Sequence, residues 1–143
     1  MRPFRVSDLK WTWGGDLALN HQGDLGYTSD NALRSFLQEV RTRLQSELYD
    51  WKLQPHIGAS MVDLIGEPNN KETAELGRTK IIASLVKDDL VAASSISVKY
   101  MPVDQCHILY RITLTLPGAT EQEIVDVSFL LDTEASEITF LDR

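Results

Sequence analysis

The chain has 143 residues, 43% of them hydrophobic, with a formal net charge of −7 at pH 7 and a pI of about 4.9. This length and apolar fraction are typical of a single globular domain that buries a real core. The acidic charge leaves no basic surface for phosphate groups, so we expect neither nucleic acid nor an anionic membrane surface as a partner.

Cysteine content and terminal pattern bear on the cellular compartment. Cys106 is the single cysteine, so no disulfide can form within the chain. Residues 1–5 are charged but no apolar segment of the signal-peptide kind follows them. No apolar run approaches the roughly 18 residues of a membrane-spanning helix. We therefore expect a soluble protein that is made in the cytoplasm.

The N-terminal part predicts an extended arm over residues 1–15, followed by one domain over residues 16–143. Trp11 and Trp13 flank Thr12, so in a strand both rings would lie on one side, against the domain or against a partner. Residues 16–27 have the pattern of a β-hairpin with turn residues at its centre. No internal repeat or low-complexity segment is evident.

The spacing of apolar residues predicts a first amphipathic helix over residues 31–49, with Ser29 or Asp30 as its N-cap. Its other face carries Arg41 and Arg43 among further polar residues. That face is either a solvated surface or a polar contact surface. The apolar stripe consists of Leu33, Phe36, Leu37, Val40, Leu44 and Leu48.

A second amphipathic helix is predicted from Lys71 to about Leu90, with Asn69 or Asn70 as its N-cap. Gly77 lies inside it at a cost of about 1 kcal/mol relative to Ala, which predicts close packing at that position. The side chains expected to face inward are Leu76, Ile81, Ile82, Leu85, Val86 and Leu90.

The C-terminal part predicts strands. Residues 96–100 and 108–116 alternate between apolar and polar side chains, and shorter strands follow at residues 124–131 and 138–141. A hairpin, two helices and an antiparallel β-meander make the fold class α+β in one domain. Charged residues around the third strand either protect its edge or flank an edge that is open to strand addition by a partner.

Reactive side chains do not form a recognisable site. Cys106 and His107 would point to opposite faces of a strand, and the three histidines lie in separate elements. There is no glycine-rich phosphate loop, no G-x-S-x-G motif and no evident pair of glycosidase carboxylates. We therefore expect no catalytic residue, no metal ion and no cofactor.

Residues 16 to about 116 carry four short motifs in a fixed order: D-L-x-L, G-D-L, R-T-R-L and P-x-x-G-x-x-x-x-x-L-x-G. This layout resembles the baseplate wedge family of contractile phage tails, sometimes labelled lysozyme-like, which includes the sheath initiator of T4-type phages. Many members carry Glu-Pro-Arg after the last helix, where this chain has Val91-Ala92-Ala93. The matching residues are Asp16, Leu17, Leu19, Gly23, Asp24, Leu25, Arg41, Thr42, Arg43, Leu44, Pro55, Gly58, Leu64 and Gly66.

The resemblance implies a non-enzymatic baseplate component of the virion that helps to nucleate the tail sheath by offering β-strand edges to sheath subunits. The implied partners are the tail sheath protein, other wedge proteins and tail tube or hub proteins, with several copies around a six-fold axis. Another tail or tube-proximal adaptor and a small cell-wall glycan hydrolase are the alternatives. The candidate partner-binding residues are Trp11, Trp13, Arg41, Arg43, Ile124, Val125, Val127, Phe129, Leu131, Ile138 and Phe140.

Overall fold

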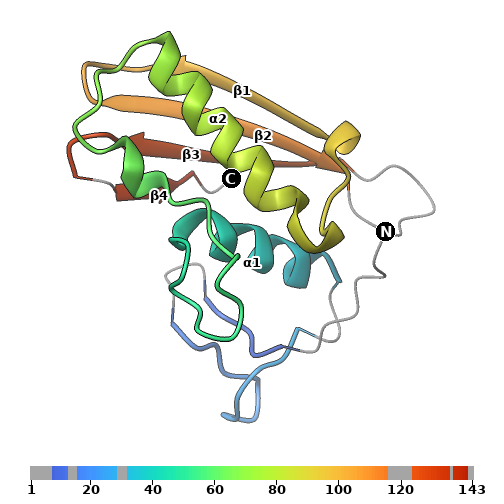
Figure 1. Ribbon diagram of the computed structural model, residues 1–143. Helices are drawn as coiled ribbons and strands as arrows, with labels where there is room; N and C mark the ends of the chain where they lie inside the picture. Colours follow the sequence, from blue (N-terminus) through green and yellow to red (C-terminus); the bar gives the residue numbers. More distant parts are fainter. Residues whose placement is uncertain (1–7, 13–15, 29–31, 116–123, 136, 142–143) are drawn as a thin grey trace.

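The computed structural model of the chain describes residues 8–12, 16–28, 32–115, 124–135 and 137–141 (Figure 1). Two α-helices and a four-stranded antiparallel sheet confirm the predicted α+β class. Within the described residues, no helix has the length and apolar character needed to span a bilayer. The elements are α1 (Ala32–Gln45), η1 (Met61–Leu64), α2 (Lys71–Val86), η2 (Lys87–Asp89), η3 (Ala93–Ser95), β1 (Ile96–Pro102), β2 (His107–Thr115), β3 (Ile124–Asp132) and β4 (Glu137–Phe140).

The sheet has the strand order β1-β2-β3-β4, and every neighbouring pair is antiparallel. One register row crosses all four strands through Tyr100, Tyr110, Phe129 and Phe140. The ring centroids along this row are 6.3, 5.3 and 5.8 Å apart, which is the normal distance range for aromatic pairs. The row lies on the face of the sheet that packs against the helices: Tyr110 and Phe129 belong to the buried core, and Tyr100 and Phe140 pack against it from either side.

Helix α2 runs across the sheet and packs closely where Gly77 meets β2 (Figure 1). A Cβ atom at Gly77 would lie only 2.1 Å from Tyr110 Oη, and this hydroxyl donates to the carbonyl of Ala74 at 3.0 Å. The predicted close packing at Gly77 is confirmed. The prediction that Leu76 faces inward is wrong, because the small residues of α2 face the sheet and Leu76 is 48% exposed.

Both helices end earlier than their sequence patterns suggest. Helix α1 stops at Gln45, and Tyr49 has the left-handed φ of 74°, so Leu48 leaves the apolar stripe and is exposed. Helix α2 stops at Val86, because Lys87 turns to an extended ψ of 144° and Asp88 adopts a positive φ. The backbone after Val86 therefore turns away from the axis of α2.

Arg43 of α1 is buried and caps the end of α2. Its Nη1 donates to the carbonyl oxygens of Ser84 at 2.9 Å and Lys87 at 2.7 Å, and its Nη2 donates to Glu39 at 2.8 Å. Carbonyls in the last turn of a helix lack partners within the helix. The guanidinium supplies a donor to one of these, that of Ser84, and another to the carbonyl of Lys87 just beyond the helix. The polar face of α1 was expected to be either solvated or a contact surface, and Arg43 is neither, because it is 1% exposed.

Residues 8–12, 16–20 and 24–28 form a closed ring of three short extended segments, drawn in blue below α1 in Figure 1. The central residue of each segment bonds to the central residue of the next. The backbone N–H of Lys10 donates to Gly26 at 2.9 Å, that of Gly26 to Ala18 at 2.8 Å, and that of Ala18 to Lys10 at 2.8 Å. Each segment therefore donates to one neighbour and accepts from the other.

The ring follows an eight-residue repeat, so the prediction that the chain has no internal repeat is wrong. Asp-Leu recurs at residues 8–9, 16–17 and 24–25, and in each pair the aspartate Oδ1 accepts the N–H of the following leucine. The two segments expected as a hairpin share the bridge between Leu19 and Leu25. Two more bridges join residues 8–12 to both of them.

The ring is attached to α1 through Gln38, which is buried. Its Oε1 accepts the N–H of Trp11 at 2.9 Å, and its Nε2 donates to the carbonyl of Leu9 at 2.9 Å. Arg34 adds a hydrogen bond from Nη2 to the carbonyl of Trp11. The described part of the N-terminal arm is therefore bound to the domain by backbone and side-chain hydrogen bonds.

Candidate functional site

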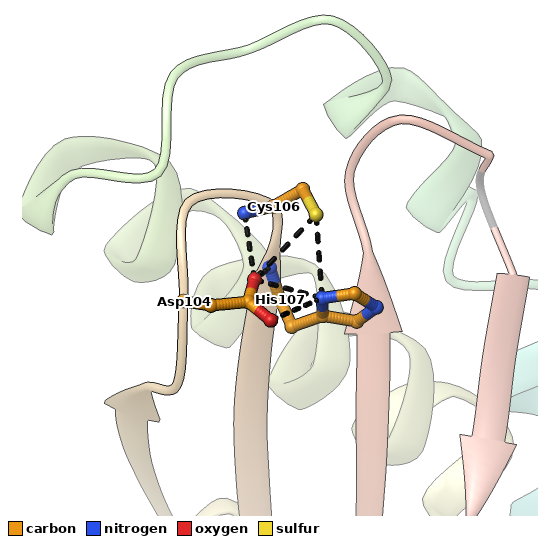
Figure 2. Close-up of side chains that lie close together, drawn as sticks. All are labelled: Asp104, Cys106 and His107. Atoms are coloured by element: carbon orange, nitrogen blue, oxygen red, sulfur yellow. Dashed lines mark hydrogen bonds and ion pairs between the residues drawn. The ribbon is translucent and has the colours of Figure 1, made fainter.

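Three potential ligand side chains meet in the turn between β1 and β2 (Figure 2). The Sγ of Cys106 lies 3.3 Å from Nδ1 of His107 and 3.5 Å from Oδ1 of Asp104. The same Nδ1 lies 2.8 and 2.9 Å from the two carboxylate oxygens of Asp104. A thiol, an imidazole and a carboxylate thus converge within four residues of sequence.

The sequence-based argument that Cys106 and His107 point apart is wrong, because only His107 belongs to the strand. Cys106 lies in the turn, where strand alternation does not apply. Asp104 Oδ1 accepts the backbone N–H groups of Cys106 and His107 at 2.9 Å each. An aspartate that accepts from the backbone two or three residues later is a known turn-forming pattern, and it is visible in the sequence.

This turn is fixed from two sides. Asn69, just before α2, donates from Nδ2 to the carbonyls of Asp104 and His107. Thr133, just after β3, donates to the carbonyl of Cys106 from its N–H at 2.8 Å and from its hydroxyl at 3.1 Å. Within the described residues, the cluster therefore sits on a loop whose backbone is held by two other parts of the fold.

The charges of the cluster oppose nucleophilic chemistry. The backbone N–H of Cys106 and the hydrogen bond with His107 lower the pKa of Asp104 to about 2. Burial, with a hydrogen bond to Asp104, raises the pKa of the Cys106 thiol to about 11. The hydrogen bond to Asp104 raises the pKa of His107. Because a reactive cysteine needs a thiolate, a thiol held protonated at neutral pH is a poor nucleophile.

A cavity of about 460 Å³ lies beside α1, lined mostly by polar residues of α1, of the loop after α1 and of η2, together with Asp8 of the N-terminal segment. Two of its carboxylates face Arg43: Glu39 accepts from it at 2.8 Å, and Asp88 lies 3.7 Å from it and 2.6 Å from Nε2 of His56. The third carboxylate, Asp8, accepts the backbone N–H of Leu9. A glycosidase requires one carboxylic acid that is kept protonated, in a site without such compensation. The ion pairs in this cavity join α1, the loop after α1 and η2, and they do not provide the protonated acid that glycan hydrolysis requires.

The predicted partner-binding residues fall into different environments. Arg43 is buried as the cap of α2, and Arg41 lies over the ring of Phe140 with 4.2 Å between its Cζ and the ring centroid. Trp11 is 41% exposed and Ile124 is 66% exposed, whereas Trp13 lies outside the described residues. The buried core contains Val127, Phe129 and Leu131, and Val125, Ile138 and Phe140 pack against it.

The sheet edge predicted for strand addition is partly covered. Strand β4 pairs with β3 from Phe129 to Asp132, and the N–H of Leu141 extends this pairing to the carbonyl of Ser128 at 2.9 Å. Residues 124–127 project beyond that point, and no strand of the described chain pairs with them on this side.

The ring presents exposed apolar side chains that the sequence analysis did not single out as a surface. Alternate residues of each segment point away from the ring centre, because the Cβ direction at the central Gly26 leads toward Ala18 and Lys10. A spacing of eight between Asp-Leu pairs was the signal that could have identified them. The outward apolar residues with large exposure are Trp11, Leu17, Leu19, Leu25 and Tyr27.

Comparison of the chain with family models, with curated proteins and with solved structures finds no match. The resemblance to baseplate wedge proteins therefore rests on the four sequence motifs alone.

Proposed function

We propose that this chain is a structural, non-enzymatic component of a contractile tail baseplate in the virion, and that it binds tail sheath subunits by accepting a β-strand. The edge of β3 at residues 124–127 carries the proposal. This edge offers the backbone groups of an extended segment. It belongs to a sheet that is packed against the helices through the aromatic row. Strand addition needs such an edge and no reactive side chain.

The hydrogen-bonding direction along β3 identifies the groups that an added strand would use. Since Ser128 accepts from Leu141, even-numbered residues of β3 direct their N–H and C=O groups toward the β4 side. Ile124 follows the same parity, and its side chain is 66% exposed. An incoming sheath strand would therefore bond to the backbone of Ile124 and continue the line begun by β4.

The test is a pull-down of the cognate tail sheath protein with two variants of Ile124. Ile124→Pro removes one edge N–H at the first residue of a strand, where proline is tolerated, and we expect it to weaken sheath binding at least tenfold. Ile124→Thr keeps the N–H and a β-branched side chain, and we expect near-normal binding. Equal binding by both variants, or no binding by the wild-type chain, would refute the proposed strand addition.

A deletion of the C-terminal strands is a poorer test. Phe129 and Leu131 of β3 are fully buried, and β3 has β2 on its other side. Removing them would take apart the core, so that a loss of binding would report unfolding. Point substitutions at the projecting end of β3 leave these contacts in place.

The second candidate function is that of a tube-proximal adaptor that docks through the ring. The exposed apolar residues of the ring favour it, because such side chains gather where proteins meet. In this version Leu19→Ser and Tyr27→Ser together abolish tail assembly while the domain stays folded. Normal assembly with that double variant would exclude the adaptor role and leave the edge proposal standing.

A further inference from the structure

We propose that Asp104, Cys106 and His107 bind a divalent transition-metal ion of the zinc class. Each residue offers one ligand atom, and these atoms all lie within 4.8 Å of one another. Zinc is held in proteins by the same three donor types: thiolate sulfur, imidazole nitrogen and carboxylate oxygen. The site is independent of the proposed baseplate function.

Two of the three distances between the donor atoms match the edges of a coordination tetrahedron. With metal bonds of about 2.0 Å to nitrogen or oxygen and 2.3 Å to sulfur, a tetrahedron spaces its ligands by about 3.3–3.5 Å. The Sγ atom is 3.3 Å from Nδ1 and 3.5 Å from Oδ1, which fits two edges of that figure. Nδ1 and Oδ1 are 2.8 Å apart, and a small rotation of the Asp104 carboxylate opens this edge.

A second carboxylate orients the imidazole. Nε2 of His107 lies 3.6 Å from Oδ2 of Asp132, the residue opposite it on β3. In this structure Nδ1 faces the Asp104 carboxylate and the Nε2–Asp132 separation is longer than a hydrogen bond. Once the ion replaces the Nδ1 proton, Asp132 would accept the remaining proton on Nε2, as in many carboxylate–histidine–zinc sites. Figure 2 shows Nδ1 turned toward Cys106 and Asp104, the side on which the ion would sit.

The backbone carrying the ligands is preorganised. The hydrogen bonds from Asn69 and Thr133 fix the three carbonyls of the turn, so the ligands need to move little on binding. Preorganised ligands lose less conformational entropy when they bind. The ion would tie the β1–β2 turn to the end of β3 through the orienting contact of Asp132.

The donor set selects the class of metal. One sulfur and one nitrogen donor favour zinc, cobalt and nickel over magnesium and calcium, which prefer oxygen. On binding, the Cys106 thiol releases its proton to solvent, and Nδ1 of His107 gives up the proton that it directs at Asp104, which leaves a neutral imidazole protonated at Nε2. Three protein ligands leave a fourth position for a water molecule.

The experiment is a titration of tag-free, reduced protein with Co²⁺ alone, followed by displacement with Zn²⁺. We expect one ion per chain, tetrahedral cobalt absorption and a thiolate-to-cobalt charge-transfer band. Cys106→Ser should abolish that band and weaken binding at least tenfold, and Asp104→Asn should weaken binding about tenfold. Asp132→Asn should weaken binding about tenfold with the band retained, because it changes only the orienting contact. His21→Ala, which alters a histidine in a distant turn, should bind as the wild type does.

Folding is checked independently of the metal. Circular dichroism of each variant, and a rise of the melting temperature with Zn²⁺ in the wild type but not in Cys106→Ser, separate loss of a ligand from loss of the fold. Should the serine variant not fold, Cys106→Ala takes its place. A wild-type protein without the charge-transfer band, or equal affinity in the cysteine variant, would overturn the proposal.

Discussion

The contact between Gly77 and Tyr110 determines how closely α2 approaches the sheet, and it gives the sharpest stability prediction. Gly77→Ala places a Cβ atom 2.1 Å from Tyr110 Oη, 2.9 Å from its Cζ and 3.1 Å from Leu64 Cδ1. Since Tyr110 is fully buried in the middle of the aromatic row, it has no free space to move into. Either the helix moves away from the sheet or the tyrosine loses its bond to Ala74.

The opposing contributions have different sizes. Alanine favours the helix over glycine by about 1 kcal/mol. Overpacking a core costs about 1–3 kcal/mol, and a buried hydroxyl or carbonyl without its partner costs about 1–3 kcal/mol more. We therefore expect Gly77→Ala to lower the free energy of unfolding by about 1–5 kcal/mol, although the same substitution would stabilise an exposed helix.

The assay is urea denaturation followed by circular dichroism, with Thr79→Ala on the exposed side of α2 as the matched control. The control should raise the free energy of unfolding by no more than about 0.7 kcal/mol, which is the gain in helix propensity from threonine to alanine. Tyr110→Phe removes the atom that clashes most, at a cost of about 1 kcal/mol for the hydrogen bond to Ala74. Combined with Gly77→Ala, it should be less destabilising than the sum of the two single changes.

Two outcomes would contradict this reasoning. A stabilised Gly77→Ala variant would mean that helix propensity dominates and that α2 does not lie against Tyr110. Strictly additive effects of Gly77→Ala and Tyr110→Phe would mean that the two residues are not in contact. Either outcome would remove the packing argument for the position of α2.

Four further predictions concern other parts of the fold. Arg43→Met should lower the free energy of unfolding by about 3–5 kcal/mol in denaturant titrations, because it removes the hydrogen bonds to the carbonyls of Ser84 and Lys87 and the ion pair with Glu39. The pKa of His107 is raised in the fold, so its contribution is complete below pH 6.5 and is lost as pH rises through the folded pKa; the stability difference between wild type and His107→Gln should shrink over that range. Asp104→Asn should remove a contribution that is present above pH 4 and fades as pH falls toward 2, measured by the same comparison. Gly26→Leu should reduce hydrogen-exchange protection in the ring while leaving the amides of β2 protected, because the side chain would enter the ring centre.

Local patterns predicted the strands well. All four lie within two residues of the predicted limits at each end, because a strand with one buried face shows its period of two in the sequence itself. The helix ends were less predictable, since Arg43 reaches the end of α2 from another helix and no local pattern encodes that contact. The exposure of Leu76 likewise depends on a contact with another element. Because Gly77 is the residue of α2 that meets Tyr110, the neighbouring Leu76 faces solvent.

The metal-ligand cluster was within reach of sequence reasoning. Asp104, Cys106 and His107 are almost consecutive, so their proximity needs no knowledge of the fold. The alternation of a strand does not extend to Cys106, because the carboxylate of Asp104 closes a turn over the next residues. The orienting Asp132, by contrast, depends on the register of β2 and β3 and could not be inferred from spacing.

Substitutions in the ring and in β3 distinguish the two proposed functions. Its backbone bonds require room at the centre, which Ala18 and Gly26 provide, but they do not require Leu19 or Tyr27 to be apolar, since both point outward and are more than half exposed. A polar side chain at either position would satisfy the same backbone bonds. Strand addition at Ile124, in turn, uses backbone groups and tolerates side-chain changes. Sensitivity to side-chain chemistry in the ring therefore indicates the adaptor function, and sensitivity to a lost N–H in β3 indicates the sheath-binding function.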